Sequence, residues 1–133
     1  AAPVPIGSGQ APMLEEIASG PALARQFGNS GGDARIVIAA ALRGDQRAHA
    51  IVMQATSLLG AAIAQLANCL DPSVIVIGGG LGSAPGPYFE SLKEGITDRI
   101  WKGLDRQIDV RRAVLGADAG LAGAALAADL RLR

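Results

Sequence analysis

The sequence predicts a helix-rich α/β domain with a small parallel sheet. Apolar residues recur at helical spacing in several segments, and one unbroken run of β-branched residues has the character of a strand. The order of elements, helices first and then strand, helix, strand and helix, favours two parallel strands joined by a crossover. With 133 residues, half of them hydrophobic, the chain can bury one core.

The first third of the chain predicts a loop followed by short helices. Residues 1–12 are rich in Pro and Gly and predict an irregular entry. Helical spacing from Met13 to Ala18 predicts a short helix, which should stop at Gly20 and Pro21 before PALARQF begins another. The turn GNSGGD ends in Asp33, which is expected to cap a helix over ARIVIAAALR.

The longest helix is predicted to run from Gln46 to Leu70, with Asp45 as its cap. One apolar stripe along it should be buried, because its members lie three or four residues apart: Ile51, Ala55, Leu58, Ala62 and Leu66.

The run Val74–Ile77 predicts a parallel strand buried on both faces, and Gly78, Gly79 and Gly80 follow it at once. A helix is expected over residues 88–101, with Phe89, Leu92, Ile96 and Ile100 on its buried side. A second strand is expected over residues 108–115, interrupted by the pair Arg111 and Arg112, which we predict to be solvated. An Ala-rich helix should end the chain.

Composition excludes several classes of partner. Twelve basic and twelve acidic residues cancel, so no net field attracts nucleic acid or an anionic membrane. Apolar runs too short or too interrupted to span a bilayer predict no membrane partner. The lone Cys69 rules out an internal disulfide and a thiolate cluster for zinc, which suits a cytoplasmic protein, and its apolar neighbours predict an inert buried thiol.

Three segments together resemble the C-terminal part of the ROK family of sugar kinases and transcriptional repressors. They are LEEIASGPALARQ, the stretch from ALRGDQRAHA to VIVIGGGLG, and LGADAGLAGAALAADL. The resemblance implies that residues 13–133 form the C-terminal lobe of the actin-like or hexokinase-like (ribonuclease H-like) ATPase fold, one part of a two-lobed protein. It also implies association into homo-oligomers.

The zinc signature of that family, Cys-x-Cys-Gly-x-x-Gly-Cys-x-Glu, falls on residues 6–15. Gly9 and Glu15 match the signature. Ile6, Ser8 and Met13 replace its cysteines, and none of them supplies a thiolate, so residues 1–12 should form a degenerate form of the motif that binds no zinc.

The resemblance implies that the intact protein transfers the γ-phosphoryl group of ATP, with magnesium, to a hexose, as a glucokinase or fructokinase does. The family's Asp-x-Gly-Gly-Thr hairpin and its Asn-Asp pair, which carries the catalytic aspartate, do not occur in this sequence, so no catalytic residue is assigned. One alternative is the sugar-sensing domain of a ROK regulator, which would contact DNA only through an upstream winged helix. Another is a noncatalytic dimerisation module.

Two candidate sites follow from the resemblance. Glu15 would contact sugar hydroxyls as a hydrogen-bond acceptor, although a glutamate favoured by the helix dipole explains its position equally well. Gly78, Gly79 and Gly80 would form the adenosine side of the ATP site, because glycines after a strand let a nucleotide approach the backbone. A simple tight turn is the alternative, and the triplet fits neither a Rossmann fingerprint nor a P-loop.

Overall fold

A computed structural model describes residues 13–29, 31–103 and 107–131 of the chain. The predicted loop over residues 1–12 lies outside these ranges. The described elements confirm the helix-rich α/β class with its small parallel sheet. Their order is α1 (Leu14–Ala18), α2 (Gly20–Phe27), α3 (Ala34–Leu42), α4 (Gln46–Leu70), β1 (Val74–Ile77), α5 (Gly79–Ser83), α6 (Pro87–Thr97), β2 (Asp109–Arg112), the 3-10 turn η2 (Gly116–Asp118) and α7 (Ala119–Arg131).

Polar side chains set where three of the N-terminal helices begin. Ser19, Asp33 and Asp45 each accept a hydrogen bond from a backbone N–H in the first turn of the helix that follows, at 2.9 to 3.3 Å. These bonds satisfy amides that have no partner within the helix. The predicted caps at Asp33 and Asp45, and the predicted break between two short helices near Ser19, are confirmed.

Helix α4 has the predicted bounds, but its buried stripe differs from the predicted one. Ile51 and Ala55 are buried as expected, whereas Leu58 and Ala62 are half-buried and Leu66 is 61% exposed. The side that faces the other helices consists mostly of small residues, since close helix packing requires small side chains at the contact. These buried residues are Ala48, Ile51, Val52, Ala55, Thr56, Gly60, Ala64 and Ala67.

Helices α4 and α6 pack so closely that their backbones touch. A Cβ atom placed on Gly60 would lie 2.8 Å from the carbonyl carbon of Gly95, so only glycine fits there. Nearby, Thr56 Oγ1 and Ser91 Oγ are 2.6 Å apart in a buried hydrogen bond. The predicted buried face of α6 is confirmed, although the helix ends at Thr97 rather than near residue 101.

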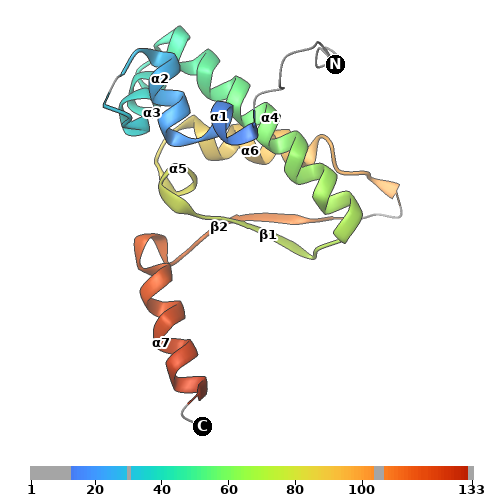
Figure 1. Cartoon of the computed structure of the whole chain (residues 1–133). Helices are drawn as coiled ribbons and strands as arrows, with labels where there is room; N and C mark the ends of the chain where they lie inside the picture. Colours follow the sequence, from blue (N-terminus) through green and yellow to red (C-terminus); the bar gives the residue numbers. More distant parts are fainter. Residues whose placement is uncertain (1–12, 30, 104–106, 132–133) are drawn as a thin grey trace.

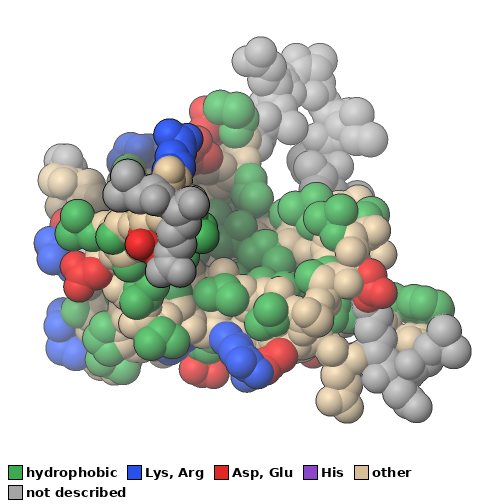
Figure 2. Space-filling view, turned by 90° about the horizontal axis from the view of Figure 1, so that it is seen from below, with side chains coloured by type: hydrophobic (Ala, Val, Ile, Leu, Met, Phe, Trp, Pro, Cys, Tyr) green, Lys and Arg blue, Asp and Glu red, His purple; other side chains and the backbone are tan. Residues whose placement is uncertain are grey.

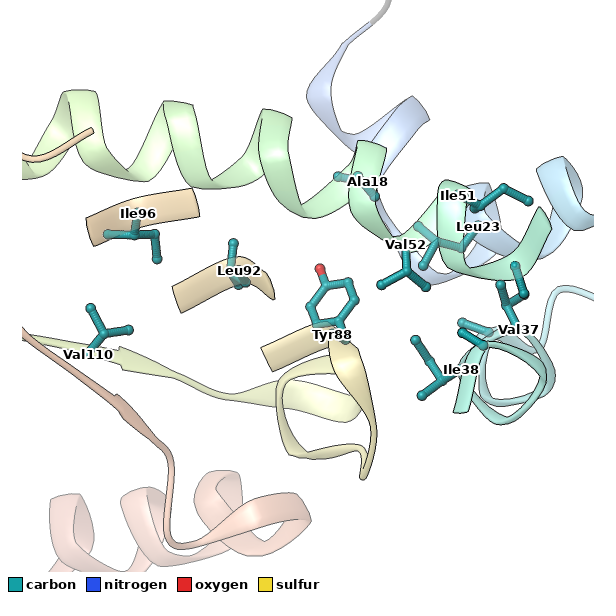
Figure 3. Packing of buried hydrophobic residues seen from close by; sticks show 14 of the residues in the cluster. Ala18, Leu23, Val37, Ile38, Ile51, Val52, Tyr88, Leu92, Ile96 and Val110 are labelled. Carbon is teal, nitrogen blue, oxygen red and sulfur yellow. The ribbon is translucent and has the colours of Figure 1, made fainter. Parts of the chain in front are cut away.

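Side chains from α2, α3, α4 and α6 meet in one core, as Figure 3 shows for Leu23, Val37, Val52 and Leu92. Val110 extends this core to the sheet and is 3% exposed. The helices α1 to α4 and α6 therefore all lie on one side of the two strands (Figure 1).

The two strands pair in parallel, with Val74 opposite Asp109 and Ile77 opposite Arg112, which confirms the predicted pairing. The prediction that the first strand is buried on both faces is wrong. Ile75 and Ile77 pack against the helical core, whereas Val74 and Val76 are exposed because no described element covers their side of the sheet. The apolar run thus indicated a strand that can be buried on two sides, but the described part of the chain covers only one of these sides.

The second strand is shorter than predicted, and its arginines lie inside it rather than interrupting it. Arg111 is exposed, as expected. Arg112 is not simply solvated, because its guanidinium lies 4.3 Å from the centre of the Phe89 ring. Val114 and Leu115 follow the strand and are exposed.

Helix α7 points away from the rest of the molecule, on the side of the sheet opposite the other helices (Figure 1). None of its residues is buried. Leu121, Leu126 and Leu130 are exposed among them.

Helix α4 has the length and hydropathy that would let a helix cross a bilayer, with a mean hydropathy of 1.6 over its most apolar window. By length and composition, residues 46–70 do not meet the expectation that the apolar runs are too short or too interrupted to span a bilayer. Length and composition are weak indicators, however, because a helix at the centre of a protein core meets the same criteria. Here α4 packs against α3 and α6 and contributes much of the core.

Candidate nucleotide site

The three predicted glycines form a sharp turn between β1 and α5. Gly78 is extended and precedes the first turn of α5, and Gly79 has a φ of 80°, a conformation that favours glycine. Gly80 has no positive φ, and a Cβ atom placed on it would meet no other part of the described protein within 4 Å. Neither backbone conformation nor packing within the described chain therefore requires glycine at position 80.

An open cavity of about 740 Å³ lies beside this turn. Gly78, Gly79 and Gly80 all line it, so the structure places the predicted residues together at one site. Apolar side chains form much of the remaining wall, and they come from α3, α4 and α6: Ile38, Leu59, Ile63, Tyr88 and Leu92. Seen from below, the molecule has a recess with hydrophobic side chains inside it (Figure 2). A concave, mainly apolar site with a few polar groups is typical of ligand pockets.

Asp33 and Arg35 add charge to the lining of the cavity. Arg35 Nε donates to Asp33 Oδ1 at 3.1 Å, and this hydrogen bond holds the pKa of the Asp33 carboxyl below its ordinary value. The carboxylate also caps the N-terminus of α3 and so offsets its positive dipole. The Asp33–Arg35 pair carries no net charge, so this end of the cavity offers hydrogen-bonding groups without a net positive field for a phosphate.

Tyr88 is the tyrosine of α6 and lines the cavity while being only 3% exposed. Burial raises the pKa of its hydroxyl, because the charged phenolate loses solvation. Figure 3 shows the ring between α6 and α4, with the hydroxyl directed toward α4. The sequence predicted residue 88 only as the start of a helix. Its one signal was its rarity, as the single tyrosine of a chain with few aromatic residues.

Glu15 lies in the first turn of α1, and its side chain is exposed. It is not among the residues that line the cavity. The neighbouring Glu16, which sequence reasoning left without a role, accepts a hydrogen bond from the Met13 N–H at 2.8 Å and so satisfies an amide at the start of this helix. The proposed sugar contact of Glu15 stays a prediction.

The expectation of a buried thiol is wrong, because Cys69 is exposed. It lies on the side of α4 that faces away from the core, where Leu66 and Leu70 are also exposed. The same misjudged helix face explains both errors, since Cys69 lies three residues after Leu66 and falls on the same side of the helix.

Within residues 13–29, 31–103 and 107–131, no three His, Cys, Asp or Glu side chains gather closely enough to hold a metal ion. The carboxylate at the cavity, Asp33, is engaged by Arg35. The described residues that line the cavity therefore offer no set of carboxylates that fits a magnesium ion. The predicted lack of zinc depends largely on residues 1–12, which lie outside the described ranges.

A profile of the ROK family matches residues 7–130 of the chain. The bifunctional enzyme NanE/NanK of Brucella melitensis is 41% identical over 114 residues, which are 84% of this chain and 21% of that protein. The N-acetylmannosamine kinase of Shigella boydii is 33% identical over 92% of this chain and 41% of its own length. The chain therefore spans less than half the length of these relatives.

Solved structures agree in fold. A ROK hexokinase from Thermus thermophilus superposes with a TM-score of 0.74 at 37% identity, over 90% of this chain and 42% of that one. A ROK glucokinase from Streptomyces griseus, solved with glucose and AMPPNP, gives 0.72 at 28% identity, over 88% and 44%. The fold is thus part of the actin-like ATPase fold of ROK hexokinases, and the chain belongs to the ROK family.

Proposed function

We propose that this chain forms the nucleotide side of a ROK sugar kinase and that its cavity receives the adenosine part of ATP. The observation that carries the proposal is the position of Gly78, Gly79 and Gly80 at the end of β1, lining a largely apolar cavity. Ligands of α/β folds bind at the carboxyl ends of parallel strands, where glycines let them approach the backbone. The glucokinase from Streptomyces griseus, with its bound AMPPNP, supports this assignment.

The cavity suggests an orientation for the nucleotide. The apolar side chains of Ile38, Leu59 and Tyr88 suit the face of a purine ring. The Asp33–Arg35 pair suits a hydroxyl or amino group and presents no net positive charge to a phosphate, so the phosphates would leave the cavity on the side away from the start of α3. The chain would bind and orient ATP, whereas proton transfer from the sugar hydroxyl requires an acid–base residue from elsewhere in a complete kinase.

The substrate of the complete protein would be a hexose or an amino sugar. Relatives of this chain are named as glucokinases and as N-acetylmannosamine kinases, and in each the phosphoryl acceptor is a sugar. Glu15 is the residue that we assign to a sugar hydroxyl, from its match to the family signature. The named functions of these relatives favour a kinase over a ROK regulator.

Titration calorimetry with ADP tests the proposal, using the wild-type chain and Gly80→Ala. The added methyl group meets open space in the unliganded chain and improves helix propensity, so the melting temperature should not fall. In the cavity it would take space needed by the ligand, and we expect ADP affinity to fall about tenfold or more.

Gly123→Ala is the matched control, because its methyl group also meets open space but lies on α7, away from the cavity lining. Its ADP affinity should equal that of the wild type. Absence of ADP binding by the wild-type chain, or equal affinity in Gly80→Ala, would contradict the proposed nucleotide site.

Self-association is a second candidate role, and the exposed leucines of α7 favour it: Leu121, Leu126 and Leu130. Leu126 and Leu130, four residues apart, share one face of the helix, whereas Leu121 lies on the opposite face, and exposed apolar side chains tend to be buried by association. Light scattering over a range of concentrations should give a mass above that of one chain. A constant monomer mass at high concentration would count against this role.

A further inference from the structure

Two adjacent arginines at the end of β2 have different surroundings. Arg111 is 68% exposed at its side chain and pairs with Asp109 on its own strand, with 2.6 Å between Nε and Oδ2. Arg112 is about half as exposed, at 35%, and its contacts are with residues of the α5–α6 region rather than its own strand. A simple solvated arginine does not explain this second arrangement.

The guanidinium of Arg112 makes three contacts. Its Nη1 donates to the backbone carbonyl of Ala84 at 3.2 Å. Its Nη2 lies 3.5 Å from Glu90 Oε1, and its Cζ lies 4.3 Å from the centre of the Phe89 ring. One side chain thereby connects the end of β2 with the end of α5 and with the first turn of α6.

One of these contacts is with a residue of the cavity wall. Ala84 follows directly after α5 and itself lines the cavity, and Phe89 is next to the lining residue Tyr88. Helix α5 also packs tightly on β1, because a Cβ atom on Gly82 would lie 2.8 Å from Ile77 Cγ2. The short helix is therefore held at its middle by Ile77 and at its end by Arg112.

We propose that Arg112 is a positioning residue for the nucleotide cavity: it holds the end of α5, and so fixes the glycine turn between β1 and α5. The expected effect on nucleotide binding rests on the proposed function, whereas the effect on the position of α5 does not. Helix α5 has five residues, three of them glycine, and cannot keep its place through helix stability alone. Leu81 and Gly82 pack against the core and β1, and the hydrogen bond from Arg112 to Ala84 constrains the C-terminal end.

Arginine is suited to this task, whereas lysine is not. A planar guanidinium donates to a carbonyl and a carboxylate at once while stacking on an aromatic ring. The ammonium group of a lysine is a single point of charge and cannot keep all three contacts. Arg112→Lys therefore keeps the positive charge but loses the planar group that makes all three contacts at once.

The test compares Arg112→Lys with Arg111→Lys, a matched change one residue away on the same strand. Hydrogen exchange is measured by mass spectrometry for the peptide that covers residues 79–84, and ADP affinity by calorimetry. In Arg112→Lys we expect faster exchange in this peptide and about five- to tenfold weaker ADP binding, from the loss of a charged hydrogen bond and a cation–π contact. Arg111→Lys should match the wild type in both measurements.

The outcomes separate the two proposals. If the wild-type chain does not bind ADP, the proposal of a nucleotide site is wrong. Hydrogen exchange over residues 79–84 still decides whether Arg112 positions α5. Unchanged exchange over residues 79–84 in Arg112→Lys would overturn the positioning role. Faster exchange throughout the chain with a lower melting temperature would overturn it too, because a general structural role would then explain the contacts.

Discussion

The two sides of the β1–β2 sheet differ in how the chain covers them. On one side, α2, α3, α4 and α6 form a core in which Leu23 and Ile96 are fully buried. On the other side, Val74 and Val76 are exposed, and α7 projects with none of its residues buried (Figure 1). Residues on both sides lie within the ROK match. A segment can therefore match the family and still be exposed in this chain.

This difference indicates where the stability of the chain originates. Burial of apolar side chains is the main favourable term in folding, and it is concentrated on the helical side. Helix α7 has short-range contacts with η2 and depends on its Ala-rich sequence. In the proposed kinase, we expect the remaining lobe or a second copy to cover the open side.

Two matched leucines provide the largest test of the comparison. Leu23→Ala removes a fully buried side chain, and we expect it to lower the free energy of unfolding by about 2–5 kcal/mol. Leu126→Ala changes a side chain that is 61% exposed on α7, and we expect a change within about 0.5 kcal/mol. Denaturant titration of both variants measures these values. A large loss in Leu126→Ala would mean that α7 is packed against another surface in solution.

Local chemistry made much of the fold predictable from the sequence. The caps at Asp33 and Asp45 depend on hydrogen bonds over two or three residues, and the run Val74–Ile77 has a strong strand preference. The errors concern which face meets a neighbour. Leu66 looked buried because it is large and apolar, but the packed face of α4 selects small residues instead.

The site was predictable only where it coincides with a local signal. Glycines directly after a strand predicted the turn at Gly78, Gly79 and Gly80, and the family resemblance gave that turn a ligand. Asp33 was predicted only as a cap, and Arg112 as a solvated residue. Their positions at or near the cavity arise because α3, α6 and β2, distant in sequence, come together only in the folded chain.

Two glycines provide a smaller test of the same comparison. Gly60 lies where α4 touches α6, and the Cβ of an alanine would lie 2.8 Å from the carbonyl carbon of Gly95. Overpacking costs about 1–3 kcal/mol, and a clash with backbone atoms belongs to the upper part of that range, about 2–3 kcal/mol. Better helix propensity returns about 1 kcal/mol, so Gly60→Ala should lower the free energy of unfolding by about 1–2 kcal/mol.

Gly123 on α7 is the matched position, because the same methyl group meets open space there. Gly123→Ala should raise the helical signal in far-UV circular dichroism and leave the midpoint of global unfolding nearly unchanged, since α7 adds little to the core. The different outcomes of the two substitutions, a loss of stability and a nearly unchanged midpoint, would follow from one physical difference, namely whether a second helix occupies the space beside the glycine. Equal stabilisation by both would show that α4 and α6 can separate at no cost, and the close contact assigned to the helical side would be wrong.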